Sequence, residues 1–332
     1  MKALVTGGGG FLGMAIVHQL LDRGDDVRSL ARGDYPELRE LGVETLRGDI
    51  ADARVVADAV EGCDLVFHVA AKAGVWGPYQ DFYRPNVMGT ENILDACRIH
   101  KVPRLVYTSS PSVVYGDEPL RGVDESVAYP QNYLTAYPET KAIAERKVLK
   151  ANGKALRTVS LRPHLIWGPG DNHLVPRIVD RARRGKLKKV GDGKAIVDSV
   201  YIDDAARAHL LAADALTESA ADVGGNAYFI TQGEPTEIGE LIDRIVAAAG
   251  LPPVTAHVPE KVAYGVGWLL ETVYRLLRRK QEPLMTRFVA KQLATDHYFD
   301  ISAAREDLGY EPRYTIDEGM KELAKWLAQA DV

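Results

Sequence analysis

The sequence predicts an α/β protein: a Rossmann-type doubly wound parallel sheet followed by a smaller, helix-rich C-terminal domain. Short β-branched runs alternate with helix-length segments through the first half of the chain. A glycine-rich turn follows the first of these runs, and the regular alternation stops near residue 165. The 332 residues are enough for one large or two ordinary domains.

The elements of the first part follow from these runs in order. Strands are expected at residues 2–6, 26–30, 43–47, 65–69, 104–108 and 155–161. Helices are expected at residues 12–23, 53–59, 89–100 and 137–152. This alternation is typical of a parallel sheet covered by helices on both faces.

The breakers after the last of these strands predict where the chain leaves the first domain. Pro163 and the run Gly168-Pro169-Gly170-Asp171 interrupt the regular pattern. We therefore predict a first domain at 1–165, to which the chain returns at about 196–232 with strands at 199–202 and 227–231. The second portion spans 166–332, mainly 166–195 and 233–332, and is expected to cap the carboxyl edge of the sheet.

Composition excludes several classes of protein. Hydrophobic residues make up 46% and charged residues 26% of the chain, which is typical of a globular fold. A net charge of -5 predicts no nucleic-acid partner. The longest apolar run, 262–270, is shorter than the roughly 20 residues of a membrane-spanning helix, and no secretion signal is expected. Cys63 and Cys97 lack metal-ligand spacing, so we expect a reducing, cytoplasmic compartment and no metal.

The turn after the first strand predicts a dinucleotide site. Gly7, Gly10 and Gly13 open an apolar helix that continues through Phe11 and Leu12. Glycine is needed there because a side chain would block the tight turn and the approach of a pyrophosphate to the helix N-terminus.

The end of the second strand bears on which dinucleotide binds. Ala31 occupies the place where an acidic residue would bind the ribose hydroxyls of NAD, and Arg32 follows. A guanidinium suits the 2'-phosphate of NADP(H), and the alternative is a solvated arginine at a strand end. Asp49 and Ile50, after the third strand, are expected near the adenine.

Residues after the fourth strand and on the last helix complete the expected cleft. Ala70, Ala71 and Lys72 follow the fourth strand, where the backbone must pass the cofactor. Tyr137 and Lys141 lie four residues apart, so one helix face presents both. An adjacent cation is expected to lower the pKa of a phenol and to make it a useful proton carrier.

The exit of the fifth strand offers a hydroxyl for the same site. Ser110 is the first choice and Ser109 the reserve for a donor that polarises a substrate carbonyl. A tyrosine, a lysine and a serine brought together with a dinucleotide predict carbonyl reduction or its reverse. Tyr137, Lys141 and Ser110 are thus the predicted catalytic residues.

Several motifs together resemble the extended short-chain dehydrogenase/reductases, and within them the 3β-hydroxysteroid dehydrogenase branch. The motifs are Thr6-Gly-Gly-Gly-Gly-Phe-Leu-Gly13, Thr108-Ser-Ser110, Val114-Tyr-Gly116, Tyr137-Pro-Glu-Thr-Lys141, Leu161-Arg-Pro163 and Tyr201-Ile-Asp-Asp204. The segments 70–77, 86–92 and 162–173 are most similar to bacterial β-keto acid reductases of olefin biosynthesis. The match covers nearly the whole chain.

This resemblance implies a reaction and its partners. It implies that a 2-alkyl-3-oxoalkanoate, an apolar substrate, is reduced to the 3-hydroxy acid with NADPH. Lys141 would hold the nicotinamide ribose, and Pro163 would join the cofactor site. It also implies a homodimer that pairs through the helices at 89–100 and 137–152, and contacts with other enzymes of the pathway are a further expectation.

The sequence also allows other interpretations. One alternative is a sugar-nucleotide epimerase or dehydratase that uses NAD, because such enzymes need cations for a diphosphate and the chain offers Arg177, Arg181, Arg183 and Arg184. Further alternatives are a 3β-hydroxysteroid or sterol dehydrogenase and a non-catalytic NADPH-binding scaffold. The aromatic segment 74–83 is either a substrate lid or a loop packed on the domain interface. The amphipathic segment 262–280 could wall an acyl pocket, touch a membrane, bind a partner enzyme or pack on the first domain.

Overall fold

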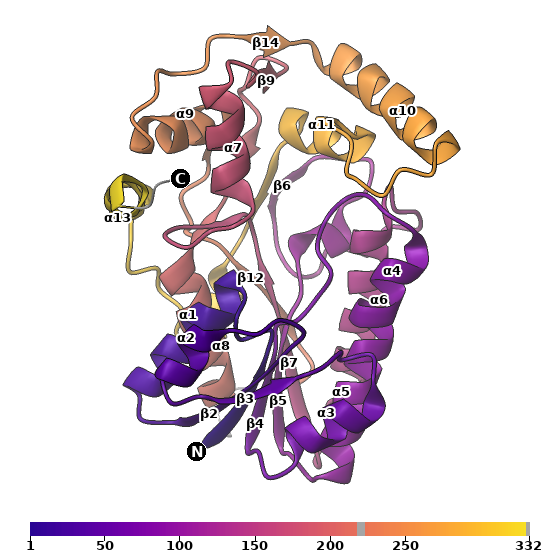
Figure 1. The fold of residues 1–332 in the computed structure, drawn as a ribbon, viewed down its shortest axis with the longest axis vertical. Helices are drawn as coiled ribbons and strands as arrows, with labels where there is room; N and C mark the ends of the chain where they lie inside the picture. Colours follow the sequence, from indigo (N-terminus) through magenta and orange to yellow (C-terminus); the bar gives the residue numbers. More distant parts are fainter. Residues whose placement is uncertain (218–222, 330–332) are drawn as a thin grey trace.

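The computed structural model describes residues 1–217 and 223–329, and a seven-stranded parallel sheet forms its centre (Figure 1). Across the sheet the strands are β12 (Ala227–Ile230), β7 (Arg157–Pro163), β5 (Arg104–Thr108), β4 (Leu65–His68), β1 (Lys2–Thr6), β2 (Asp26–Ala31) and β3 (Glu44–Arg47). The order reverses between β4 and β1. In such sheets ligands bind beyond the carboxyl ends of the strands at this switch point.

Helices cover both faces of this sheet (Figure 1). One face carries α3 (Ala53–Val60), α5 (Gly89–Ile99) and α6 (Ala136–Lys150), and the other carries α1 (Phe11–Asp22) and α8 (Ile202–Ala215). Each layer buries its own apolar cluster against the sheet, as expected for strands that are covered on both sides. The predicted doubly wound fold is confirmed, and the strands β1 and β5 have the predicted bounds.

The rest of the chain forms a smaller mixed region. Its helices are α7 (Leu174–Arg183), α9 (Ile238–Ala248), α10 (Glu260–Leu276), α11 (Arg287–Ala294), α12 (Ser302–Leu308) and α13 (Ile316–Gln329). A four-stranded sheet accompanies them, in the order β13 (Thr236–Glu237), β10 (Ile196–Val197), β15 (His297–Phe299) and β6 (Leu120–Val123). Its strands come from four distant parts of the chain, so periodicity within one segment could not predict it.

One predicted strand has a different partner from the expected one. Residues 199–202 were expected to return to the main sheet, but β11 (Val200–Tyr201) pairs with β8 (Ile166–Trp167) in a separate two-stranded sheet. The rings of Trp167 and Tyr201 lie 5.4 Å apart and are buried. These two aromatic side chains therefore pack against each other across the paired strands. Where a strand was expected at 227–231, β12 pairs with β7 in the main sheet, and the domain division at residue 165 stays a prediction.

Candidate active site

A cleft lies at the carboxyl ends of β1, β2, β4 and β5 and encloses about 520 Å³, within the usual range for small-molecule sites. Thirteen of the predicted site residues line it: Gly7, Gly10, Phe11, Leu12, Gly13, Arg32, Asp49, Ile50, Ala70, Ala71, Lys72, Tyr137 and Lys141. The structure therefore brings the predicted cofactor residues other than Pro163, including the predicted Tyr-Lys pair, to one cavity.

The glycine turn forms the floor of this cleft below the N-terminus of α1. Gly7 adopts a φ of +74°, a conformation that side chains disfavour. A Cβ on Gly13 would lie 2.1 Å from the Gly7 carbonyl oxygen, so only glycine fits there. The first amides of α1 face the cavity without a side-chain cap at Gly10. This cradle fits a pyrophosphate, which binds to such amides and to the helix dipole.

The far end of the cleft fits the adenosine half of a dinucleotide. Arg32 follows β2 in the cleft wall and is exposed, and no acidic side chain in the described chain lies within ion-pair distance of it. The Tyr35 ring packs beneath the turn, where a Cβ on Gly9 would lie 2.3 Å from it. Asp49 accepts a hydrogen bond from the Ala51 amide at 3.0 Å, which fixes the turn after β3 in the cleft lining.

Tyr137 lines the other end of the cleft, and Ser110 contacts it from outside the cleft lining. Tyr137 lies in the first turn of α6, and Ser110 caps the short 3-10 turn Pro111–Val114. Burial raises the pKa of Tyr137, while a hydrogen bond from the Ser110 hydroxyl opposes that rise. At neutral pH the phenol is therefore protonated and available as a proton donor. Ser109 lines the cleft and Ser110 does not, but of these two serines Ser110 is the one that contacts Tyr137.

Lys141 is buried one helical turn further along α6. Its Nζ donates to the Thr108 carbonyl oxygen at 2.5 Å and lies 4.2 Å from the centre of the Tyr107 ring. Burial lowers the pKa of Lys141 to about 7, although the charge of Glu145 opposes this shift. The expectation that the lysine lowers the pKa of Tyr137 is wrong for this state, because the ammonium points to Thr108 and the burial of the phenol dominates.

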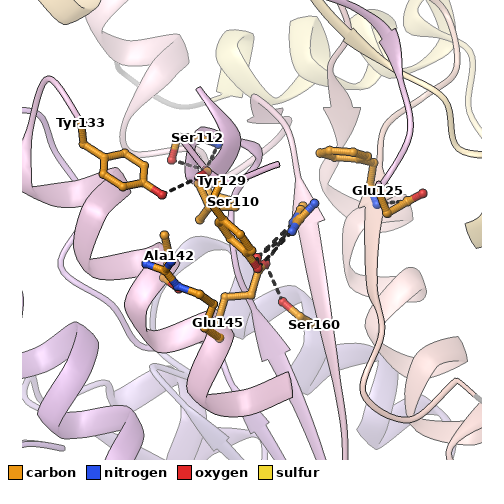
Figure 2. Close-up of polar contacts among 12 residues, drawn as sticks. Ser110, Ser112, Glu125, Tyr129, Tyr133, Ala142, Glu145 and Ser160 are labelled. Atoms are coloured by element: carbon orange, nitrogen blue, oxygen red, sulfur yellow. Dashed lines mark hydrogen bonds and ion pairs between the residues drawn. The ribbon is translucent and has the colours of Figure 1, made fainter. Parts of the chain in front are cut away.

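A buried ion pair joins Glu145 of α6 to Arg162 of the sheet, one helical turn after Lys141 (Figure 2). Arg162 of β7 donates to both carboxylate oxygens of Glu145, at 2.7 Å and 3.0 Å, and Tyr129 and Ser160 donate to the same carboxylate. Burial alone would raise the pKa of Glu145, but Arg162 and the hydroxyls outweigh it and hold the pKa below its usual range. This network was not predicted from the sequence.

Asn86 ties the exit of β4 to α6. Its Oδ1 accepts from the Lys72 amide at 2.7 Å, and its Nδ2 donates to the Lys72 carbonyl oxygen and to Thr140 Oγ1. The loop at residues 70–73 is thereby held beside Tyr137 and Lys141. Asn86 was visible only as part of a motif and was not identified as a positioning residue.

Some predicted site residues lie outside the cleft lining, and some residues that were not predicted belong to it. Ser110 and Pro163 are not among the residues that line the cleft, and Pro163 lies buried in β7. His173 and Asn172 line it although neither was predicted. Asp171 holds this turn, because its carboxylate accepts from the backbone amides of three residues at the start of α7. The Gly168-Pro169-Gly170-Asp171 run, which breaks the regular pattern of the sequence, could have indicated this turn.

Two alternatives left open by the sequence can be compared with the structure. Trp76 of segment 74–83 packs on α10: its ring meets Tyr274 edge-on, and its Nε1 donates to the Arg279 carbonyl oxygen at 3.0 Å.

The four arginines of α7 and its C-terminal end do not line the cleft; Arg177 pairs with Glu282 and Arg184 with Asp180. They offer no diphosphate site in this cavity.

Within residues 1–217 and 223–329, no cluster of side chains is suited to hold a metal ion. In the same part of the chain, no helix combines the length and the apolar character needed to cross a bilayer.

Known proteins are similar to this chain in sequence and in fold. It is 51% identical over 328 residues to the 2-alkyl-3-oxoalkanoate reductase of Shewanella oneidensis, which covers 97% of this chain and 85% of that protein. It is 50% identical to the protein of the same name from Stenotrophomonas maltophilia, over 97% of this chain and 98% of that protein. The solved structure of MoeE5 with UDP-glucose and NAD matches with a TM-score of 0.76 at 26% identity, covering 99% of both chains.

Residues 4–258 match the 3-beta hydroxysteroid dehydrogenase/isomerase family. A 3 beta-hydroxysteroid dehydrogenase/Delta 5-->4-isomerase of Mycobacterium tuberculosis is 38% identical over 97% of this chain and 89% of that protein. The predicted enzyme class is confirmed: the chain is an NAD(P)-dependent oxidoreductase of the extended short-chain type, and it belongs to the 3-beta hydroxysteroid dehydrogenase/isomerase family.

Proposed function

We propose that the protein reduces a 2-alkyl-3-oxoalkanoate to the 3-hydroxy acid with NADPH. The observation that carries this proposal is the identity of about half of all aligned residues with two 2-alkyl-3-oxoalkanoate reductases over nearly the full chain. The cleft supports it, because a protonated phenol and a buried lysine stand together beside a dinucleotide cradle.

The roles of the site residues follow from their chemistry. Bound NADPH would supply the hydride that attacks the 3-keto carbon. Tyr137 gives its proton to the carbonyl oxygen as the C=O electron pair moves onto that oxygen, so the product is a neutral alcohol. Ser110 donates a hydrogen bond to the phenolate oxygen that remains. Lys141 would hold the cofactor ribose and would supply positive charge to the site.

NADPH rather than NADH is proposed from the end of β2. A 2'-phosphate needs a cation with free donors, and Arg32 has no acidic partner among the described residues. Ala31 lacks the carboxylate that would repel this phosphate.

A substrate panel tests the proposal. The protein is incubated with NADPH or NADH and with a long-chain 2-alkyl-3-oxoalkanoate, a 3-ketosteroid or a UDP-sugar, and cofactor oxidation and products are measured. We expect the 3-hydroxy acid with NADPH. Turnover of the steroid alone would favour the second candidate, a 3β-hydroxysteroid dehydrogenase, which the M. tuberculosis relative supports. Epimerisation of the sugar without net cofactor change would refute both.

The setting of the enzyme is proposed with the same reasoning. Cys63 and Cys97 are both buried and free, which favours the cytoplasm. The homodimer and the pathway partners stay predictions.

A further inference from the structure

Helix α10 packs against its neighbours through two small residues and a glutamate rather than through large apolar side chains. Its inward positions are Ala263, Gly267 and Glu271, four residues apart on one face. A Cβ on Gly267 would lie 2.6 Å from the carbonyl carbon of Thr286, so the backbones are in close contact. Glu271 accepts from the Arg287 guanidinium at 2.8 Å and 3.0 Å, which fixes the helix to α11.

The large apolar side chains of α10 and the turn after it point to solvent instead. They are Val262, Tyr264, Val266, Trp268, Leu269, Val273, Leu276, Leu277 and Leu284, each more than a third exposed. Trp268 is 55% and Leu276 79% exposed. This distribution is the reverse of an ordinary surface helix, which buries its apolar stripe. Contiguous exposed apolar surface of this kind marks an interaction site.

Cations gather at the C-terminal end of the same surface. Segment 260–284 contains five lysines and arginines and three glutamates, whereas the whole chain has a net charge of -5. Two of these glutamates, Glu271 and Glu282, are already held by Arg287 and Arg177. The end of the helix therefore presents mainly positive charge from Arg278, Arg279 and Lys280 next to exposed leucines.

Charge decides between a second copy of this chain and a lipid surface. If two copies paired α10 in parallel, their cationic ends would meet and repel each other. In an antiparallel pair each cationic end would meet Glu260 and Lys261, which offer no net negative charge. Phosphate headgroups complement both features, because they attract the cations while the acyl region accepts tryptophan and leucine.

We propose that α10 and the turn to residue 284 form an interfacial surface that binds anionic lipid bilayers. The helix lies at one end of the molecule, beside α11 and beyond the carboxyl edge of the main sheet (Figure 1). It lies in the plane of the interface without crossing the bilayer. Trp76 connects this surface to the loop whose Ala73 lines the cleft. The inference goes beyond the proposed reduction and stands without it.

Vesicle sedimentation tests this surface on the full-length protein. Wild-type protein should sediment with vesicles of equal parts phosphatidylcholine and phosphatidylglycerol, less at high salt, and not with phosphatidylcholine alone. A variant with Arg278→Glu, Arg279→Glu and Lys280→Glu should bind roughly a hundredfold more weakly. Trp268→Glu with Leu269→Glu should abolish sedimentation, because the apolar anchor becomes charged.

Matched controls lie at the amino ends of the strands. Lys101→Glu, Lys150→Glu and Lys154→Glu change the charge by the same amount at exposed positions, and Ile99→Glu charges an apolar residue that is even more exposed than Trp268 and Leu269. These controls should bind vesicles as the wild type does. Thermal unfolding of every variant shows that it is folded.

Two outcomes would overturn the proposal. One is that the wild-type protein stays in the supernatant with anionic vesicles, or that all α10 variants sediment with these vesicles to the same extent as the wild type. The other is a dimer in analytical ultracentrifugation that Trp268→Glu converts to a monomer without any lipid binding, which would assign the surface to a second copy.

Discussion

Two groups of cations in this molecule differ in what balances their charge. Arg162 is buried beneath α6 and has Glu145 as its carboxylate partner. Two other cations have no carboxylate within ion-pair distance among the described residues. They are Lys141, one turn before Glu145 on α6, and Arg32, in the cleft wall. The difference separates a charge that holds the scaffold from charges that are left for a cofactor or substrate.

Breaking the compensated pair should have the largest effect. Glu145→Gln leaves Arg162 buried without a negative partner, and we expect the free energy of unfolding to fall by about 3–5 kcal/mol. Urea denaturation followed by circular dichroism measures it. Glu91→Gln is the control, because it removes an exposed partner of Lys147 and should cost less than about 1 kcal/mol. Equal losses in both variants would contradict the special role of the buried pair.

Removing the uncompensated lysine should have the opposite effect on stability. Lys141→Met should lower turnover by about 10³-fold, because the site loses its positive charge and its ribose contact. The free energy of unfolding should rise by about 1 kcal/mol, since a buried charge without a carboxylate partner disappears. The folded-state pKa of Lys141 is lowered, so this cost is full below pH 7 and fades as the pH rises. Steady-state kinetics and thermal unfolding at pH 6 and pH 9 check both parts, and a destabilised variant at pH 6 would refute the account.

The second uncompensated cation should affect only the cofactor. Arg32→Ala should raise KM for NADPH by about 10–100-fold and leave KM for NADH nearly unchanged, because a charge-assisted contact of about 1–3 kcal/mol to the 2'-phosphate is lost. Arg47→Ala is a nearby control outside the cleft lining. A similar loss with both cofactors would show that Arg32 is structural.

The smallest effect should appear in the pH profile. Because the pKa of Lys141 is about 7, kcat/KM for reduction should be constant below that pH and fall about tenfold per pH unit above it. In Lys141→Arg the charge persists, so the falling limb should move above pH 9 in whatever activity remains. A limb that stays near pH 7 in this variant would assign it to another group.

The sequence predicted the cofactor half of the molecule well, because its signals are local. Gly7 and Gly13 are required by backbone geometry, and β1 and β5 are continuous buried runs of apolar residues. Tyr137 and Lys141 share one helix face through their spacing alone. Each of these signals lies within a few residues of the chain.

The parts that were missed depend on contacts between distant segments. Glu145 meets Arg162 and Tyr129 only after α6 packs on β7, and Asn86 reaches Lys72 and Thr140 from η1 (Arg84–Met88). The direction of Lys141 toward Thr108 likewise depends on the packing of α6 against β5. Periodicity contains no information about such partners.

One measurement tests the central claim that Tyr137 and Lys141 direct hydride reduction of a 3-keto acid. The enzyme is supplied with NADPH carrying deuterium at the transferred position and with a long-chain 2-alkyl-3-oxoalkanoate, and the product is analysed by mass spectrometry. We predict a 3-hydroxy acid with one deuterium at C3, formed in step with NADPH oxidation, and its loss in the folded Tyr137→Phe variant. An unlabelled product, or equal labelling by Tyr137→Phe, would contradict the claim.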